Sequence, residues 1–213
     1  MDTEILTQHR VIAVLTIDSV EAAVPVTRAL LEGGVAAMEL TLRTPFAIEA
    51  IRAVKNEAPE MKVGAGTVLT VTQVDDVIAA GADFAVAPGT NPRIIQCCAD
   101  RGIPFGPGVA TPSDIEIAVE NGCRILKYFP AETLGGLKHL KNMAAPYRHL
   151  GVRFIPLGGI SAQNMRVYLD EAIIAAIGGS WIASRALIQH EDWDQIRLNA
   201  KEAALLADGA GTE

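Results

Sequence analysis

The sequence has few cysteines, none of the common metal-binding motifs and no long apolar run, and each absence excludes a class of protein. It holds three cysteines, an odd number that indicates reduced thiols rather than a disulfide framework. CxxC and HExxH do not occur and the four histidines are scattered, so we expect no structural zinc site. The longest weakly polar stretch, residues 172–183, is shorter than the roughly 20 apolar residues that span a bilayer.

Basic residues are in the minority, which bears on partners and location. The formal net charge is −7, so no overall positive field attracts nucleic acid or an anionic membrane surface. The opening residues, MDTEILTQHR, are acidic and lack the apolar core of a signal peptide, so we expect a cytoplasmic protein. Half of the residues are apolar and no low-complexity run occurs, which predicts one folded domain over residues 1–213 with a disordered tail at 208–213.

Apolar, β-rich segments alternate with helix-patterned segments along nearly the whole chain. The expected strands lie near Val11–Ile17, Ala36–Leu42, Val63–Val68, Phe84–Pro88, Pro104–Val109, Ile125–Pro130, Arg153–Gly158 and Ile173–Gly178. The expected helices lie at Val20–Glu32, Pro45–Ala58, Val71–Ala80, Pro92–Asp100, Ser113–Asn121, Leu137–Tyr147 and Asp192–Ala207. This alternation predicts a parallel sheet with right-handed crossovers, and eight repeats predict an α/β fold closed into a (β/α)8 TIM barrel. An open doubly wound sheet is the alternative, and a short N-terminal helix is expected within residues 1–9.

Charged side chains occupy one face of the second expected strand. Residues of one parity share a face of a strand, so Glu39, Thr41 and Arg43 point together, and in a barrel they point inward. A carboxylate and a guanidinium inside a barrel are costly unless they are paired or take part in chemistry. An exposed edge strand with an ordinary charged face is the alternative.

The sixth expected strand carries one lysine in an otherwise apolar run. By parity, Ile125, Lys127 and Phe129 share a face, and burial disfavours the charged form of a lysine. Lys127 is therefore either a neutral amine that attacks a carbonyl, or a lysine that reaches the barrel mouth or pairs with a carboxylate. An inward amine together with an inward acid favours a Schiff-base enzyme, which needs both a nucleophile and a group that transfers protons.

Glycines end the last two expected strands. Gly158-Gly159 follow the seventh strand, and Gly178-Gly179-Ser180 end the eighth. In barrels the loops after these strands often bind phosphate through backbone N–H groups, although a Gly-Gly pair is also common in plain turns. The segment 64–67 ends the third strand, where Thr67 is placed to bind a substrate carboxylate or the small residues simply pack closely.

Taken in order, these motifs resemble the bacterial 2-keto-3-deoxy-6-phosphogluconate (KDPG) and 4-hydroxy-2-oxoglutarate aldolases, over residues 10–206. The motifs are Glu39-Leu-Thr-Leu-Arg43-Thr44, Val63-Gly-Ala-Gly-Thr67-Val68, Pro88-Gly89, Lys127-Tyr-Phe129-Pro-Ala131-Glu132, Gly158-Gly-Ile-Ser161 and Gly178-Gly-Ser180-Trp181. The resemblance implies a class I aldolase built on a homotrimeric barrel. The implied partner is a small phosphorylated 2-keto acid. The resemblance also implies that no metal and no cofactor take part, because an iminium does the polarising that a metal would do in a class II aldolase.

The resemblance also assigns roles to residues. It implies that Lys127 forms the imine and that Glu39 transfers protons. The implied substrate-binding residues are Arg43 and Thr67 for the pyruvyl carboxylate, Pro88 and Phe129 for the pocket wall, Leu157 near the C4 hydroxyl, and the backbones of Gly158, Gly159, Gly179 and Ser180 for the phosphate.

Two positions depart from the family pattern. Leu157 stands where gluconate-type members often carry Thr and galactonate-type members carry Val, and Thr16 stands where some relatives carry Arg. The sequence thus leaves three alternatives to the gluconate-type aldolase. One is a galactonate-type aldolase, another an isomerase or epimerase in which Lys127 only binds an anion, and the third a non-catalytic phospho-sugar-binding or scaffold protein.

Overall fold

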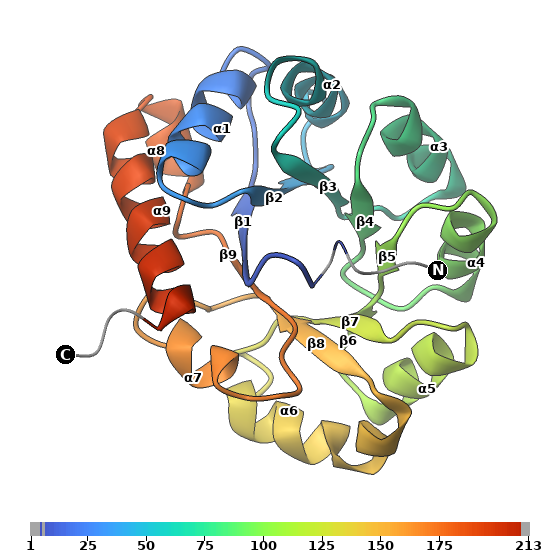
Figure 1. Cartoon of the computed structure of the whole chain (residues 1–213). Helices are drawn as coiled ribbons and strands as arrows, with labels where there is room; N and C mark the ends of the chain where they lie inside the picture. The colour runs from blue at the N-terminus through green and yellow to red at the C-terminus, as the bar shows by residue number, and fades with distance from the viewer. Residues whose placement is uncertain (1–4, 6, 210–213) are drawn as a thin grey trace.

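Strands and helices alternate around a ring in the computed structural model, which describes residues 5 and 7–209. The helices lie outside the strands (Figure 1). The strands are β1 (Val11–Leu15), β2 (Ala37–Thr41), β3 (Lys62–Gly66), β4 (Phe84–Val86), β5 (Phe105–Gly106), β6 (Gly108–Val109), β7 (Ile125–Tyr128), β8 (Arg153–Pro156) and β9 (Ile177–Gly179). The helices are α1 (Ala23–Glu32), α2 (Ala47–Glu57), α3 (Val71–Ala79), α4 (Pro92–Asp100), α5 (Pro112–Glu120), α6 (Gly136–Ala144), the 3₁₀ helix η2 (Ala145–Leu150), α7 (Met165–Leu169), α8 (Arg185–Gln189) and α9 (Trp193–Asp208).

All the paired strands run parallel, as the alternation predicted, and they form two sheets. The first has the order β5-β4-β3-β2-β1-β9 and the second the order β6-β7-β8. Isolated bridges, Phe154 with Ile174 and Leu157 with Gly178, connect β8 to the segment that contains β9. Within the described residues the assigned strands thus form an arc and a smaller partner sheet rather than one continuous eight-stranded sheet.

Two expected strands differ from the structure for identifiable reasons. The strand expected over 104–109 is divided into β5 and β6 at Pro107, which has no N–H to donate to a neighbouring strand. The strand expected over 173–178 is replaced by the shorter β9, which begins at Ile177 and ends at Gly179. The earlier part of the expected strand contributes only the bridge at Ile174. Helix α8 was not predicted, because its five residues are too few to show an apolar period.

Helices α3, α4 and α5 each begin at a side-chain cap. Thr70 and Thr111 each accept a hydrogen bond from the third residue of the following helix and complete capping boxes with Gln73 and Asp114. Asn91 caps α4, which begins with Pro92. These helices start within one residue of the predicted positions, whereas α1 starts three residues later than predicted.

The core is divided into an outer and an inner cluster. Met38 and Leu40 belong to the large cluster that includes residues of both strands and helices. The smaller cluster contains Ile12, Phe84 and Ile125. Alternate residues along strands such as β1 and β2 belong to different clusters, so the strand parity used for the sequence prediction is confirmed. The small cluster includes residues that line the space below the polar site described next.

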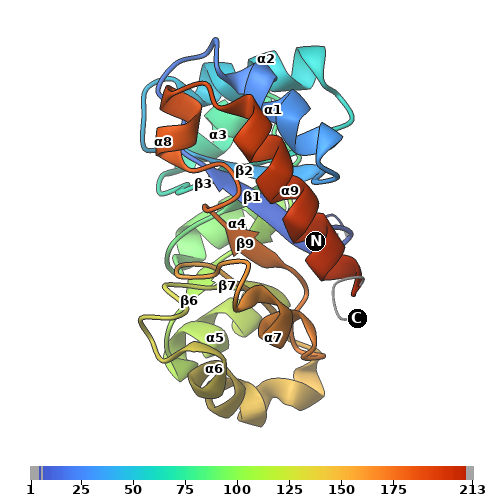
Figure 2. The same cartoon turned by 90° about the vertical axis from the view of Figure 1, so that its left-hand side faces the viewer.

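The C-terminal helix closes the ring against the N-terminal half. Helix α9 lies beside α1 in both views (Figures 1 and 2). The approach is close, because a Cβ at Gly33 would overlap the Ala200 side chain. The helix expected in residues 1–9 lies largely outside the described residues, as do residues 210–213 of the expected tail, while Asp208 is the last residue of α9. None of the helices described here is long and apolar enough to cross a membrane.

Candidate active site

A buried ion pair joins the two sheets at the centre of the ring. Lys127 on β7 donates hydrogen bonds from Nζ to Oε1 and Oε2 of Glu39 on β2, at 2.9 and 3.1 Å. Only 6% of Lys127 and 3% of Glu39 is exposed. The amine also lies 5.6 Å from the centroid of the Phe129 ring. Both residues that the sequence selected therefore face inward, and the carboxylate is within proton-transfer distance of the amine.

Two glycines on β3 leave room for this pair and for the apolar residues below it. A Cβ at Gly66 would overlap the carboxylate of Glu39, and a Cβ at Gly64 would overlap the ring of Phe84. The neighbouring strands are in register so that Glu39 stands beside Val14 on one side and Gly64 on the other. For these two glycines the packing interpretation holds, and their role in the site is to leave space for Glu39 and for its apolar floor.

A cavity of about 340 Å³, here called the central cavity, lies over the ion pair. It is lined by Val14, Glu39, Thr41, Arg43, Thr67, Pro88, Lys127, Phe129, Leu157, Gly158, Gly178 and Ser180. Every residue proposed from the sequence is in this lining except Gly159 and Gly179. The buried amine and carboxylate lie in its floor, whereas Arg43, Pro88 and Ser180 are exposed.

The two glycines outside the lining pack against their neighbours. Gly159 has φ +82°, and a Cβ there would overlap the side chain of Glu132. Gly179 is buried, and a Cβ there would overlap the ring of Trp181. Among the described residues, the backbone N–H groups of Gly159 and Ser180 make no hydrogen bond to the protein. Ser180 lines the cavity, so its amide is available to an anion there, whereas Gly159 is exposed outside the lining.

Thr67 has an unusual backbone conformation for its residue type. Its φ is +62°, in the left-handed region that β-branched residues rarely adopt. It follows β3 directly and lines the central cavity. The position holds a threonine although glycine or asparagine adopts this conformation more readily. Backbone strain of this kind concentrates at functional sites, where the position of a side chain matters more than the cost in stability.

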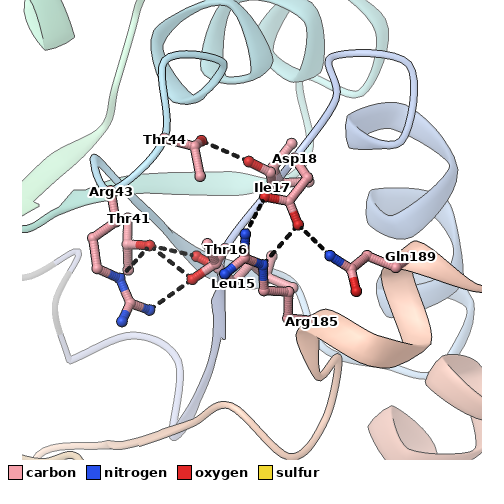
Figure 3. Close-up of polar contacts among 9 residues, drawn as sticks. All are labelled: Leu15, Thr16, Ile17, Asp18, Thr41, Arg43, Thr44, Arg185 and Gln189. Atoms are coloured by element: carbon pink, nitrogen blue, oxygen red, sulfur yellow. Dashed lines mark hydrogen bonds and ion pairs between the residues drawn. The ribbon is translucent and has the colours of Figure 1, made fainter.

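The guanidinium of Arg43 is held by hydroxyl groups. Nε donates to Thr41 Oγ1 at 3.1 Å and Nη2 donates to Thr16 Oγ1 at 2.6 Å, and the two hydroxyls lie 3.1 Å apart (Figure 3). No carboxylate pairs with Arg43 among the described residues. Thr16 thus orients the guanidinium, and the positive charge of Arg43 is left for a ligand.

Sequence reasoning missed a second arginine near the cavity. Arg185, at the start of α8, donates from Nε and Nη2 to the two carboxylate oxygens of Asp18, both at 2.7 Å. These hydrogen bonds lower the pKa of the Asp18 carboxyl below its usual range. The pairing joins residues 167 positions apart, so no local pattern in the sequence indicates it.

The donor set favours carbonyl chemistry on an anionic substrate. A lysine amine next to a carboxylate is the arrangement that forms imines, and the surrounding arginine, hydroxyls and free amides bind carboxylate or phosphate. No group of three or more His, Cys, Asp or Glu side chains within the described part of the chain is placed to hold a metal ion.

Comparisons with known proteins agree with this chemistry and place the chain among the aldolases, a class of lyases. Residues 3–198 match the family described as KDPG and KHG aldolase. The chain belongs to this family. A 2-dehydro-3-deoxy-phosphogluconate aldolase of Treponema pallidum is 45% identical over 193 residues, which cover 91% of each chain.

Solved structures agree over the whole fold. The KDPG aldolase of Zymomonas mobilis ZM4, with 3-phosphoglycerate, is 38% identical and has a TM-score of 0.88 over 95% of this chain and 94% of that one. The KDPG aldolase of Legionella pneumophila, with pyruvate captured as a covalent carbinolamine intermediate, is 37% identical and also has a TM-score of 0.88 over 92% and 95% of the two chains.

Proposed function

We propose that the protein cleaves KDPG to pyruvate and glyceraldehyde 3-phosphate through an imine on Lys127, and that it also acts on 4-hydroxy-2-oxoglutarate. The observation that carries this proposal is the buried contact of Lys127 Nζ with both carboxylate oxygens of Glu39. Family membership and the pyruvate carbinolamine in the Legionella relative support it. An isomerase or epimerase that used Lys127 only to bind an anion would not need a carboxylate that already neutralises the lysine.

Imine formation begins with proton transfer within the ion pair. Glu39 takes a proton from Nζ, and the neutral amine attacks the C2 carbonyl carbon, which gives a carbinolamine. Glu39 then returns a proton to the departing hydroxyl, water leaves, and the iminium forms. Phe84 and Ile155 form an apolar floor below the pair. Glu39 is in hydrogen-bond contact with the amine, so we assign the proton transfers to it.

Cleavage uses the iminium as an electron sink. Removal of the proton from the C4 hydroxyl drives electrons of the C3–C4 bond into the iminium, which releases glyceraldehyde 3-phosphate and leaves an enamine. Protonation of the enamine at C3 and addition of water at C2 then release pyruvate and restore the lysine amine. Glu39 lies 2.9 Å from Nζ and is placed to carry the protons in both half-reactions.

The remaining cavity residues bind the two ends of the substrate. Arg43 and the strained Thr67 are assigned to the pyruvyl carboxylate. The free amides of Gly159 and Ser180 are assigned to the phosphate, and Gly158 and Gly179 allow the backbone to approach it. Pro88 and Phe129 form the walls.

Borohydride trapping tests the proposal directly. Incubation with pyruvate followed by reduction should add one pyruvate-derived mass per chain, on a peptide that contains Lys127. Lys127→Arg should fold, trap nothing and lose cleavage, because guanidinium is not nucleophilic at neutral pH. Lys55, which pairs with Asp83 at 2.8 Å away from the cavity, supplies the control, since Lys55→Arg should trap normally. An adduct on another lysine, or none, would refute the imine.

One observation bears on the galactonate-type alternative, which differs from the proposed function in the configuration at C4. Leu157 presents an apolar side chain to the cavity, and a Cβ at Gly178 would overlap it. Because Leu157 has no hydroxyl to bond the C4 hydroxyl, it discriminates C4 epimers less than a threonine does. Rates on KDPG and its C4 epimer decide this point, and Leu157→Thr should shift the ratio toward KDPG without changing pyruvate trapping.

We also propose that the two sheets act together as one (β/α)8 barrel, in a single domain that forms a cytoplasmic homotrimer. The isolated bridges beside β8 and the short break at Pro107 support the closed barrel. The trimer is supported by family membership. A solution mass of three times 22.5 kDa tests the trimer, and a mass of 22.5 kDa would contradict it.

A further inference from the structure

Backbone pairing continues beyond the ends of β7 and β8, next to the central cavity. The N–H of Ala131 donates to the carbonyl of Leu157 at 2.7 Å, and the N–H of Glu132 donates to the carbonyl of Gly158 at 3.0 Å. We call these paired segments, residues 129–132 and 157–158, the β7–β8 wall. Three of its members line the central cavity, so the path of this backbone sets one side of the cavity.

The side chain of Glu132 fastens this wall to helix α7, which lies beside α6 in both views (Figures 1 and 2). Its Oε1 accepts a hydrogen bond from the hydroxyl of Tyr168 on α7, and only 2% of Tyr168 is exposed. No lysine or arginine pairs with Glu132 among the described residues. Burial, together with the Glu132 carboxylate, raises the pKa of the Tyr168 hydroxyl above its usual range, so this group remains a donor at neutral pH.

Two glycines allow neighbouring backbone to approach this contact. A Cβ at Gly159 would lie 2.6 Å from Cβ of Glu132, and one at Gly136 would lie 3.1 Å from Oε1 of Glu132. The Cβ at Gly136 would also lie 3.3 Å from the hydroxyl of Tyr168. Glu132 is therefore held by the loop after β8, by the start of α6 and by Tyr168. It does not line the central cavity, so it can influence a substrate only through the backbone that it fixes.

We propose that the hydrogen bond between Tyr168 and Glu132 positions the β7–β8 wall, and that both are positioning residues for the half of the substrate that leaves as the aldehyde. This inference rests on the proposed function, which puts the C4 hydroxyl near Leu157 and the pyruvyl carboxylate on Arg43 and Thr67. Those last two residues follow β2 and β3, in the other sheet. A displaced wall therefore weakens binding of the aldehyde half and leaves imine formation with pyruvate intact.

Two reactions separate positioning from a merely structural role. Cleavage of KDPG uses both halves of the substrate. Exchange of the pyruvate methyl protons with deuterated water uses only the imine, which loses a C3 proton to Glu39 and regains a deuteron as the enamine is protonated.

Tyr168→Phe keeps the buried ring and loses the hydroxyl. It should lower kcat/KM for KDPG about tenfold, because a wall displaced by a fraction of about 1 Å misplaces the aldehyde half. The rate of pyruvate exchange should stay within about twofold, because Lys127 is held by the regular pairing of β7 with β6 and β8. An equal loss in both reactions, or no loss on KDPG, would overturn the proposal.

Variants of Glu132 separate the contact from the charge. The amide oxygen of Glu132→Gln still accepts from the Tyr168 hydroxyl, so this variant should keep kcat/KM for KDPG within about twofold. Glu132→Ala removes the acceptor and should match Tyr168→Phe. A loss in Glu132→Gln as large as that in Glu132→Ala would mean that the negative charge is what matters, and would refute a positioning role.

Tyr147 supplies a matched control. Its hydroxyl donates to Oε1 of Glu116 at 2.9 Å, and neither residue lines the central cavity. Tyr147→Phe should leave both rates unchanged. A fall on KDPG equal to that of Tyr168→Phe would mean that loss of any contact of this kind lowers activity, and would refute the specific role.

Amide hydrogen exchange, followed by mass spectrometry, tests the wall without any substrate. Peptides that contain the N–H groups of Ala131 and Glu132 should exchange about tenfold faster in Tyr168→Phe than in the parent, and no faster in Tyr147→Phe. Unchanged exchange in Tyr168→Phe would overturn the proposal. If the parent itself traps no pyruvate, the proposed function fails, while amide exchange still decides whether the contact orders the wall.

Discussion

Gly66 lies against the carboxylate of Glu39, and a side chain at position 66 would occupy the space of Oε1. The glycine belongs to β3 and the glutamate to β2, and they are in adjacent strands of the six-stranded sheet. The position of the Glu39 carboxylate, to which we assign proton transfer, therefore depends on the absence of a side chain at Gly66 on the next strand.

Gly66→Ala should lower kcat with little change in KM, because it displaces Glu39 and not the substrate-binding groups. The loss should approach that of Glu39→Gln, about 10²–10⁴-fold for a general acid or base. Steady-state kinetics on KDPG measure it. Gly89 is the control, since nothing lies within 4 Å of a Cβ there, and Gly89→Ala should retain full kcat. Full activity in Gly66→Ala would show that Glu39 is not needed in its present position.

Removal of the lysine alone should be more damaging to stability than removal of both charges. Lys127→Met leaves Glu39 buried and unpaired, and breaking a buried ion pair in this way costs about 3–5 kcal/mol. The double variant Lys127→Met with Glu39→Gln should recover most of that loss. Urea denaturation of the parent, both single variants and the double variant measures the coupling. Additive losses would contradict a buried pair.

Replacement of Thr67 should trade activity for stability. Thr67→Gly relieves a left-handed conformation that costs about 1–3 kcal/mol in a non-glycine residue, and glycine adds an entropic cost of about 0.5–1 kcal/mol. We expect a net gain of about 1 kcal/mol in the free energy of unfolding, together with a raised KM.

Glu191 provides the comparison for Thr67, because it has φ +55° and does not line the central cavity. Glu191→Gly should give a similar gain in stability, measured by urea denaturation, with unchanged kinetics. If Thr67→Gly keeps the parent KM, the Thr67 hydroxyl does not bind the substrate.

Stability should fall in mildly alkaline solution because of two buried thiols. Burial raises the pKa of Cys98 to about 12 and that of Cys123 to about 11, from an ordinary value of 9.0. The folded state thus keeps protons that the unfolded state loses, so this contribution is complete below pH 9 and declines as pH rises toward 11–12. Between pH 8.5 and 10 the free energy of unfolding should drop by about 1 kcal/mol for each thiol.

The experiment is a series of urea denaturations from pH 8.5 to 10, which does not exceed the ordinary pKa of tyrosine. The Cys98→Ala, Cys123→Ala double variant should lose most of this pH dependence. Thiol reagents at pH 8 should label neither cysteine until the protein unfolds, because both thiols are buried. A parent protein whose stability is constant from pH 8.5 to 10 would contradict these shifts.

Much of the fold and site follows from local pattern in the sequence. Strand parity alone places Glu39 and Lys127 on the inner face, and both are there. The helix starts predicted at Val71 and Ser113 are confirmed to within one residue, and the capping boxes of Thr70 and Thr111 lie there. Such features depend on residues within one turn or one strand, so they can be read before any tertiary contact is known.

What was missed depends on residues far apart in the chain. Nothing near Arg185 indicates that Asp18 will hold it, and its short helix has no visible period. The division of the fifth strand at Pro107 was foreseeable from the missing N–H, but its effect on sheet continuity depends on the neighbouring strands. Sequence also did not separate Gly158, which lines the cavity, from Gly159, which packs against Glu132.

The ion pair between Lys127 and Glu39 spans 88 positions of the chain and links the two sheets. The six-stranded sheet itself is completed by β9, near the C-terminus, which pairs with β1. A growing or refolding chain therefore cannot form this ion pair, to which we assign catalysis, until its late-made segments have joined the early ones. Recovery of aldol cleavage after refolding should lag behind recovery of helix content, so catalysis reports on the last long-range step of assembly.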